Sequence, residues 1–155
     1  MKIGDKVPEW LGYNEKGEKV LMSDFLGKKL VLYFYPKDNT SGCTAEACSL
    51  RDNYSDLKDK GYEVVGVSID SEVSHRKFID KHALPFTLIA DTEKRLVQEM
   101  GVWGEKSMYG RKYMGVLRTT FLINDVGVIE KVFNSKEIKT SVHAGQILKY
   151  LNDDK

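Results

Sequence analysis

Residues 30–48 read Leu30-Val-Leu-Tyr-Phe-Tyr35-Pro-Lys-Asp-Asn-Thr40-Ser-Gly-Cys43-Thr-Ala-Glu-Ala-Cys48. The first six residues are apolar without alternation, which is typical of a strand that is buried on both faces. Pro36 ends this strand because proline has no backbone N–H to donate. A helix is predicted from about Gly42 to Lys60, where Gly61 ends it. The segment therefore predicts a buried strand that leads directly into a helix carrying two cysteines.

Strand and helix patterns alternate on the C-terminal side of this segment. Apolar runs predict further strands at residues 63–69, 86–90, 119–123 and 128–133, the last two forming a hairpin. Helices are predicted at residues 71–83, at residues 93–100 and from about Thr140 onward. Residues 102–117 contain three glycines and are predicted to form a long irregular segment.

The opening segment, through about Phe25, reads as short β-like stretches around a turn at residues 14–17. With this extension, the order of elements is βαβα followed by βαββα. That order predicts an α/β domain with a thioredoxin-like fold, in which helices flank a central mixed sheet. No repeat or linker divides the sequence, so residues 1–155 are predicted to form a single domain.

The bulk composition is that of an ordinary globular protein. The chain has 155 residues, of which 41% are hydrophobic, and its 24 basic and 23 acidic residues give a net charge of +1. This balance gives no electrostatic footprint for nucleic acid or for a membrane surface. The opening MKIGDKVPEW lacks the apolar core of a secretory signal, and no apolar run approaches the length of a membrane span. We therefore expect a cytoplasmic protein.

The two cysteines have little value as a structural bridge. Thiols are kept reduced in the cytosol, and only four residues separate Cys43 from Cys48, so a bridge would close a very small loop. Catalysis, metal binding and inert burial are the remaining interpretations of the pair.

Cys43 is predicted to lie in the first turn of its helix, which favours an anion. Unpaired backbone N–H groups and the positive end of the helix dipole are found there. The thiolate is the nucleophilic form of cysteine, so this position is chemically useful. The Thr40 hydroxyl could hydrogen-bond the sulfur or an incoming oxygen, and Pro36 could shield the thiolate from water.

The helical wheel separates the two thiols. Four residues fall within about 40° of Cys43 and make an inward stripe with it: Ala47, Leu50, Tyr54 and Leu57. Cys48 lies about 140° away, toward solvent. In a regular helix the two Cα atoms are about 8.6 Å apart, whereas a disulfide needs less than about 7 Å. The cysteines can therefore join only if the first turns of the helix unwind.

The arrangement Pro36-(x)3-Thr40-(x)2-Cys43 resembles the active-site signature of peroxiredoxins. The wider string from Tyr35 to Cys48 closely resembles the bacterioferritin-comigratory, or peroxiredoxin Q, subfamily. Asp91 and the stretches at 102–106 and 118–123 are also similar, so the resemblance covers essentially the whole chain. It departs at Ser41, where many members carry proline.

The resemblance implies a thiol peroxidase that reduces hydrogen peroxide and organic hydroperoxides without a cofactor. Cys43 would be the peroxidatic cysteine and become a sulfenic acid, and Cys48 would be the resolving cysteine that forms an intramolecular disulfide with it. Thioredoxin or a similar dithiol would restore both thiols. Arg118 matches the arginine that keeps the thiolate charged, and Pro36 and Thr40 complete the site. The resemblance also implies a monomer.

Simpler interpretations of single residues stand beside these. Cys43 could be a small buried hydrophobe, Cys48 an inert surface thiol and Arg118 a solvated arginine at a strand start. Glu46 is interpreted as favourable helix N-terminal charge and not as an acid catalyst. The three histidines are scattered and interpreted as surface or half-buried residues: His75, His82 and His143. No metal site is expected from this spacing.

Three other functions are compatible with a pair of cysteines. A disulfide reductase of the thioredoxin type would normally carry Cys-x-x-Cys, which this chain lacks. A peroxide sensor would open the helix to signal a partner but would not turn over rapidly. A metal-binding module would need ligands besides two thiols.

Overall fold

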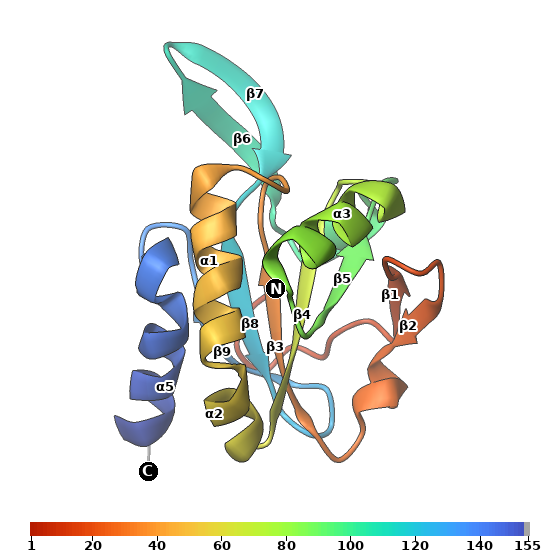
Figure 1. The fold of residues 1–155 in the computed structure, drawn as a ribbon, viewed down its shortest axis with the longest axis vertical. Coiled ribbons are helices and arrows are strands. Elements are labelled where there is room, and N and C mark those ends of the chain that lie inside the picture. The colour runs from red at the N-terminus through yellow and green to blue at the C-terminus, as the bar shows by residue number, and fades with distance from the viewer. Residues whose placement is uncertain (154–155) are drawn as a thin grey trace.

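The computed structural model describes residues 1–153, and a five-stranded sheet lies at its centre (Figure 1). The strand order is β5-β4-β3-β8-β9, with β3, β4 and β5 parallel, β8 antiparallel to β3, and β9 antiparallel to β8. The bounds are β3 Lys29–Phe34, β4 Tyr62–Ser68, β5 Thr87–Ala90, β8 Thr119–Ile123 and β9 Ile129–Phe133. The predicted central mixed sheet is therefore confirmed.

The middle strand, β3, is covered on both faces. Leu30, Leu32 and Phe34 belong to one cluster of buried side chains, and Val31 and Tyr33 belong to the other. Strands β4 and β8 pair with its two edges. The unbroken apolar run in the sequence follows from this position, because every side chain from Leu30 to Phe34 enters one of the two cores.

Helices cover both faces of the sheet. On the face of Val31 and Tyr33, buried residues come from α1 (Ser41–Asp52), α2 (Tyr54–Asp59), α3 (Glu72–His82) and α5 (His143–Asp153), with a 3-10 turn at Thr140–Val142 before α5. On the other face, they come from α4 (Arg95–Glu99) and the N-terminal β1 (Trp10–Tyr13) and β2 (Lys19–Leu21), which a 3-10 turn at Met22–Phe25 follows. Within residues 1–153, no helix has the length and apolar character needed to cross a bilayer.

The helix predicted from Gly42 to Lys60 is interrupted. Asn53 has φ −115° and ψ 14°, and its side-chain amide donates to the carbonyl of Ser49 at 2.9 Å. This break separates α1 from α2. The predicted inward stripe nevertheless holds on both sides of the break, since Ala47, Leu50 and Leu57 are fully buried and Tyr54 is half-buried.

The prediction of an irregular segment at residues 102–117 is wrong. These residues form a hairpin of β6 (Trp103–Met108) and β7 (Arg111–Val116) that projects from the body (Figure 1). Tyr109 and Gly110 join the strands with φ of 52° and 79°. Positive φ at both central residues is typical of a tight hairpin turn. The sequence did not reveal these strands because most of their side chains are exposed, which leaves no apolar alternation to detect.

Gly66, on β4, is predicted to resist substitution because its neighbours fill the space of a side chain. A Cβ there would lie 2.7 Å from Leu88 Cδ2 and 2.8 Å from Tyr33 Cε1. We expect Gly66→Ala to lower the free energy of unfolding by about 1–3 kcal/mol through overpacking, measured by urea denaturation. The matched control is Gly145→Ala in α5, where a Cβ meets nothing within 4 Å and a gain of about 0.5–1 kcal/mol is expected. Equal stability of Gly66→Ala and wild type would contradict this packing.

Candidate active site

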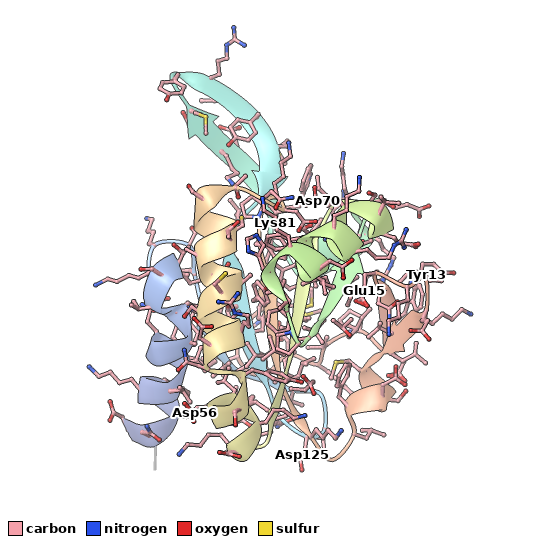
Figure 2. The ribbon with its side chains drawn as sticks, viewed as in Figure 1. Tyr13, Glu15, Asp56, Asp70, Lys81 and Asp125 are labelled. Atoms are coloured by element: carbon pink, nitrogen blue, oxygen red, sulfur yellow. The ribbon has the colours of Figure 1, made fainter. Side chains whose placement is uncertain are left out.

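The topology brings Cys43 and Arg118 together at the end of the sheet where β3 finishes and β8 begins, although they are 75 residues apart. A loop of residues 35–40 leads from the carboxyl end of β3 to α1, and Arg118 directly precedes the antiparallel β8. Asp70 follows β4 at this end, whereas Asp125, in the turn between β8 and β9, lies at the other end of the molecule (Figure 2). Ligand sites of open α/β sheets form beyond the carboxyl ends of parallel strands.

The Cys43 thiol is held against a guanidinium. Cys43 is the third residue of α1 and is 1% exposed, and Arg118 Nη2 donates a hydrogen bond to its Sγ at 3.2 Å. Burial opposes the charge of Arg118, but the neighbouring Glu46 and Cys43 raise the pKa of Arg118 above its ordinary value. A permanent cation and the first turn of a helix therefore both face the sulfur.

Glu46 is a neighbour of Cys43 and Arg118 that the sequence interpretation left out of the site. Its side chain is fully buried, and its Oε1 accepts a hydrogen bond from Arg118 Nη1 at 2.6 Å. Its Oε2 has no hydrogen-bond partner among the residues that the structure describes. Burial raises the pKa of Glu46 to about 7, although Arg118 opposes the shift. Its place one turn after Cys43 on the helix is the signal that could have put it beside the thiol.

His143 lies behind Glu46 and is likewise fully buried, contrary to the prediction of a surface or half-buried histidine. Its Nδ1 is 3.0 Å from Gln146 Oε1, and its Nε2 is 2.8 Å from Thr120 Oγ1 and 3.9 Å from Glu46 Oε2. Burial lowers the pKa of His143, and Arg118 lowers it further, against the hydrogen bond that Gln146 Oε1 accepts from His143 Nδ1. A neutral imidazole therefore borders the carboxylate.

His75 is also fully buried, which contradicts its predicted exposure, whereas His82 is half-buried as predicted. His75 is buried because α3 packs against the sheet, and His143 is buried because α5 does. An isolated histidine in a sequence gives no sign of such packing.

Pro36 lies in the loop that leads into α1, and Thr40 is the last residue before the helix. Thr40 is the exposed N-cap residue of the helix, and its hydroxyl donates to the carbonyl of Lys37 at 2.9 Å. That donor is thus committed to the loop, while the oxygen lone pairs stay available. Pro36 is half-buried in the same loop.

Cys48 does not join this group, as the helical wheel predicts. It is half-buried, both thiols are free, and α1 runs through both cysteines. Because the helix is continuous from residue 41 to residue 52, the disulfide requires part of it to open.

The chain matches a known family over most of its length. The model of the AhpC/TSA family matches residues 3–132, and the chain belongs to this family.

Curated relatives align with nearly all of the chain. The protein named putative peroxiredoxin bcp from Buchnera aphidicola is 44% identical, over 100% of this chain and 97% of its own. Peroxiredoxin Bcp from Escherichia coli is 42% identical, over 99% of this chain and 97% of its own. These similarities place the chain among the Bcp peroxiredoxins, which are thiol peroxidases, and the predicted resemblance is confirmed.

Solved structures agree with the fold. A Xylella fastidiosa PrxQ mutant superposes with a TM-score of 0.89 at 32% identity, covering 99% of this chain and 96% of its own. Xanthomonas campestris bacterioferritin comigratory protein, described for its alkyl peroxide reduction activity, superposes with a TM-score of 0.84 at 31% identity, covering 96% and 98%. The predicted thioredoxin-like fold is thereby confirmed.

The raised pKa of Glu46 predicts a pH dependence of stability. A carboxyl group whose pKa in the folded state exceeds its ordinary 4.5 stabilises the fold fully below pH 4.5, and this contribution is lost as pH rises through about 7. We expect the free energy of unfolding of wild type to fall by a few kcal/mol relative to Glu46→Gln over this range, since one pKa unit corresponds to about 1.4 kcal/mol.

Urea denaturation from pH 4.5 to pH 7.5 measures this difference. Glu130→Gln, at an exposed glutamate, serves as the matched control and should track wild type. Parallel pH profiles for wild type and Glu46→Gln would rule out a perturbed carboxyl group at this position.

Proposed function

We propose that this chain reduces hydroperoxides with Cys43 as the attacking thiolate and Cys48 as the resolving thiol, and that residues 1–155 act as one domain. The observation that carries the proposal is the 3.2 Å contact between Arg118 Nη2 and the buried Cys43 Sγ at the first turn of α1. A guanidinium has five N–H donors, so Arg118 can hold the thiolate and also donate to a bound peroxide.

In the first step, the thiolate attacks the terminal oxygen of the hydroperoxide. An S–O bond forms, the O–O bond breaks, and the electron pair leaves with the second oxygen, which takes up a proton to become water or an alcohol. Cys43 is oxidised to a sulfenic acid. Arg118 stabilises the negative charge that moves from sulfur to oxygen, and the lone pairs of the Thr40 hydroxyl can accept a hydrogen bond from the peroxide. Pro36 limits the access of water.

In the second step, the Cys48 thiolate attacks the sulfenic sulfur and releases hydroxide, which is protonated to water. An S–S bond forms, so α1 must open between the two cysteines. The break at Asn53 gives the opening a natural end, because α2 has its own start and need not unwind. Opening of a helix end is among the least costly local unfolding events.

A dithiol must then reduce the disulfide by thiol–disulfide exchange. A peroxide substrate and a thiol reductant follow from membership of the family. We propose thioredoxin or a related small dithiol protein as that reductant, a monomeric state, and the reducing cytoplasm as the compartment.

Two cysteine variants separate the proposed steps. Cys43→Ser should abolish peroxide consumption, because serine is not ionised at neutral pH. Cys48→Ser should be oxidised once at the wild-type rate but should not turn over with thioredoxin and its reductase. Rapid-mixing measurements of thiol loss, together with steady-state NADPH consumption, record both steps. Equal loss of the single turnover in both variants would contradict the division of roles.

Replacement of Arg118 tests the cation. Arg118→Met should slow the oxidation of Cys43 by about 10²-fold or more, because one preorganised donor to a developing negative charge contributes about that much. Arg95→Met is the matched control, since Arg95 donates to Trp10 and Glu99 away from the site. Oxidation of Arg118→Met at the rate of the control would overturn the proposed role of the guanidinium.

A further inference from the structure

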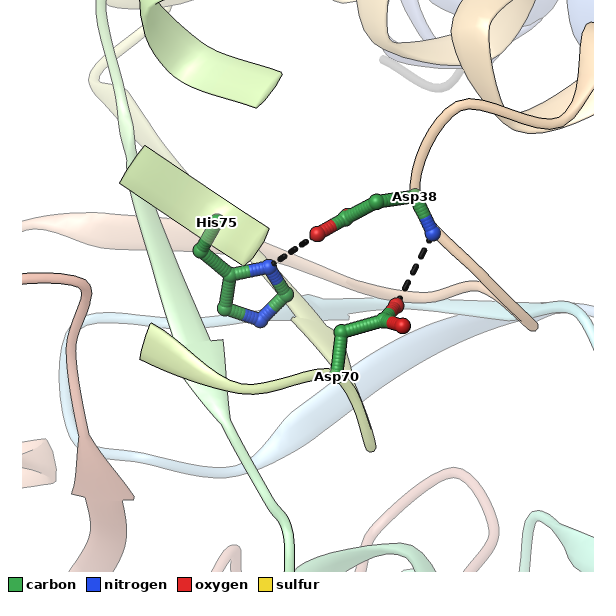
Figure 3. Close-up of side chains that lie close together, drawn as sticks. All are labelled: Asp38, Asp70 and His75. Carbon is green, nitrogen blue, oxygen red and sulfur yellow. Dashed lines mark hydrogen bonds and ion pairs between the residues drawn. The ribbon is translucent and has the colours of Figure 1, made fainter. Parts of the chain in front are cut away.

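A buried polar network holds the loop that precedes Cys43 (Figure 3). Asp38 is 4% exposed, and its Oδ1 accepts from the Tyr35 hydroxyl at 2.6 Å. Its Oδ2 accepts from Ser74 Oγ at 2.8 Å and lies 2.7 Å from His75 Nδ1. Its backbone N–H donates to Asp70 Oδ2 at 2.8 Å. Residues of α3 and of the end of β4 therefore bind one loop residue from three directions.

The hydrogen-bond partners determine the charges of the central pair. His75 Nε2 is 2.9 Å from the carbonyl of Ile89, which can only accept, so Nε2 carries a proton. Nδ1 faces the carboxylate of Asp38, and the contact needs a second proton. Burial alone would raise the pKa of Asp38, but hydrogen bonds from His75, Tyr35 and Ser74 hold it below its ordinary value. Asp38 is therefore ionised, and His75 is held through both ring nitrogens, by Asp38 on one side and by the carbonyl of Ile89 on the other.

The same side chains lie close enough to hold a metal ion, since ligand atoms of Asp38, Asp70 and His75 are within 4.8 Å of one another. Both ring nitrogens of His75 are committed to hydrogen bonds, however, so neither is available to a metal ion. The network is thus better suited to holding the loop than to binding a cation.

We propose that the ion pair of Asp38 and His75 is a clamp that fixes the active-site loop while α1 opens and closes. The proposal rests on the proposed peroxidase cycle. Asn39, with φ 64°, turns the chain between the clamped Asp38 and the N-cap Thr40. Residues up to Asp38 stay attached to α3 and to the end of β4, and movement begins after Asn39.

The clamp makes Asp38 and His75 positioning residues for the peroxide step. They do not touch the sulfur, but they hold the loop through which Pro36 and Thr40 reach the site. Without the clamp, the loop and the start of α1 would move together, and the site around Cys43 would be assembled for a smaller fraction of the time. Formation of the disulfide, which needs α1 open, would not be slowed. A split between the two steps therefore distinguishes the clamp from general stabilisation.

The experiment uses the reduced full chain and hydrogen peroxide, with rapid quenching, alkylation and mass spectrometry to follow sulfenic acid and disulfide separately. We expect Asp38→Asn and His75→Gln each to slow the oxidation of Cys43 between about 10-fold and 10²-fold, while disulfide formation keeps or exceeds its wild-type rate. The double variant should be no slower than the single variants by more than about twofold, because the residues act as one unit.

Asp91→Asn is the matched control. Asp91 is a buried carboxylate in the segment between β5 and α4. It accepts hydrogen bonds from the backbone N–H groups of Leu96 and Val97 on α4. Its replacement should change both rates in the same proportion, if at all. In wild type, ¹⁵N chemical shifts of His75 should show both ring nitrogens protonated at pH 7, a readout that does not depend on any variant folding.

Wild-type oxidation rates in both single variants, equal slowing of both steps, or a neutral His75 would each overturn the clamp and leave the peroxidase function intact. A wild-type protein that does not react with hydrogen peroxide would instead overturn the proposed function, and the clamp with it.

Discussion

The guanidinium of Arg118 is the cation around which the site is organised. It donates to Cys43 Sγ at 3.2 Å and to Glu46 Oε1 at 2.6 Å, so one permanent positive charge faces two groups that can each become anions. All three side chains are largely removed from water. In such surroundings charges interact more strongly than in solvent, and an unpaired charge is costly. The arginine therefore makes it possible to bury a reactive anion at the start of α1.

The helix that carries the thiol also carries the carboxylate. Glu46 lies between Cys43 and Cys48 on α1, so opening this helix to form the disulfide also draws Glu46 away from Arg118. The closed helix keeps the contact of Glu46 with Arg118, and in the proposed cycle the open helix gives it up. The clamp at Asp38 confines the change to the residues that follow it. Rigid and mobile parts of the site meet within the short stretch from Asp38 to Ser41.

Local patterns in the sequence predict much of the fold. The strand at 30–35, the stripe through Ala47 and Leu50, and the opposite position of Cys48 all follow from near neighbours in the chain, and the structure has them. Contacts between distant segments cannot be predicted from such local patterns. The sequence shows Glu46 only as favourable charge near a helix start, because its contact with Arg118 joins distant segments, and His75 and His143 are buried by the packing of α3 and α5. The exposed strands of the β6–β7 hairpin lack the alternation that reveals a half-buried strand. Arg118 was selected through resemblance alone, because no local rule connects it with a thiol 75 residues earlier.

That separation affects when the thiol becomes reactive. The arginine reaches Cys43 because β8 pairs with β3, and this pairing joins segments from opposite halves of the chain. During synthesis, Cys43 emerges from the ribosome long before Arg118 has been made, so the growing polypeptide carries only an ordinary thiol. Under the proposed role of Arg118, peroxide sensitivity arises only with completion of the central sheet, and unfinished chains are spared oxidation at Cys43.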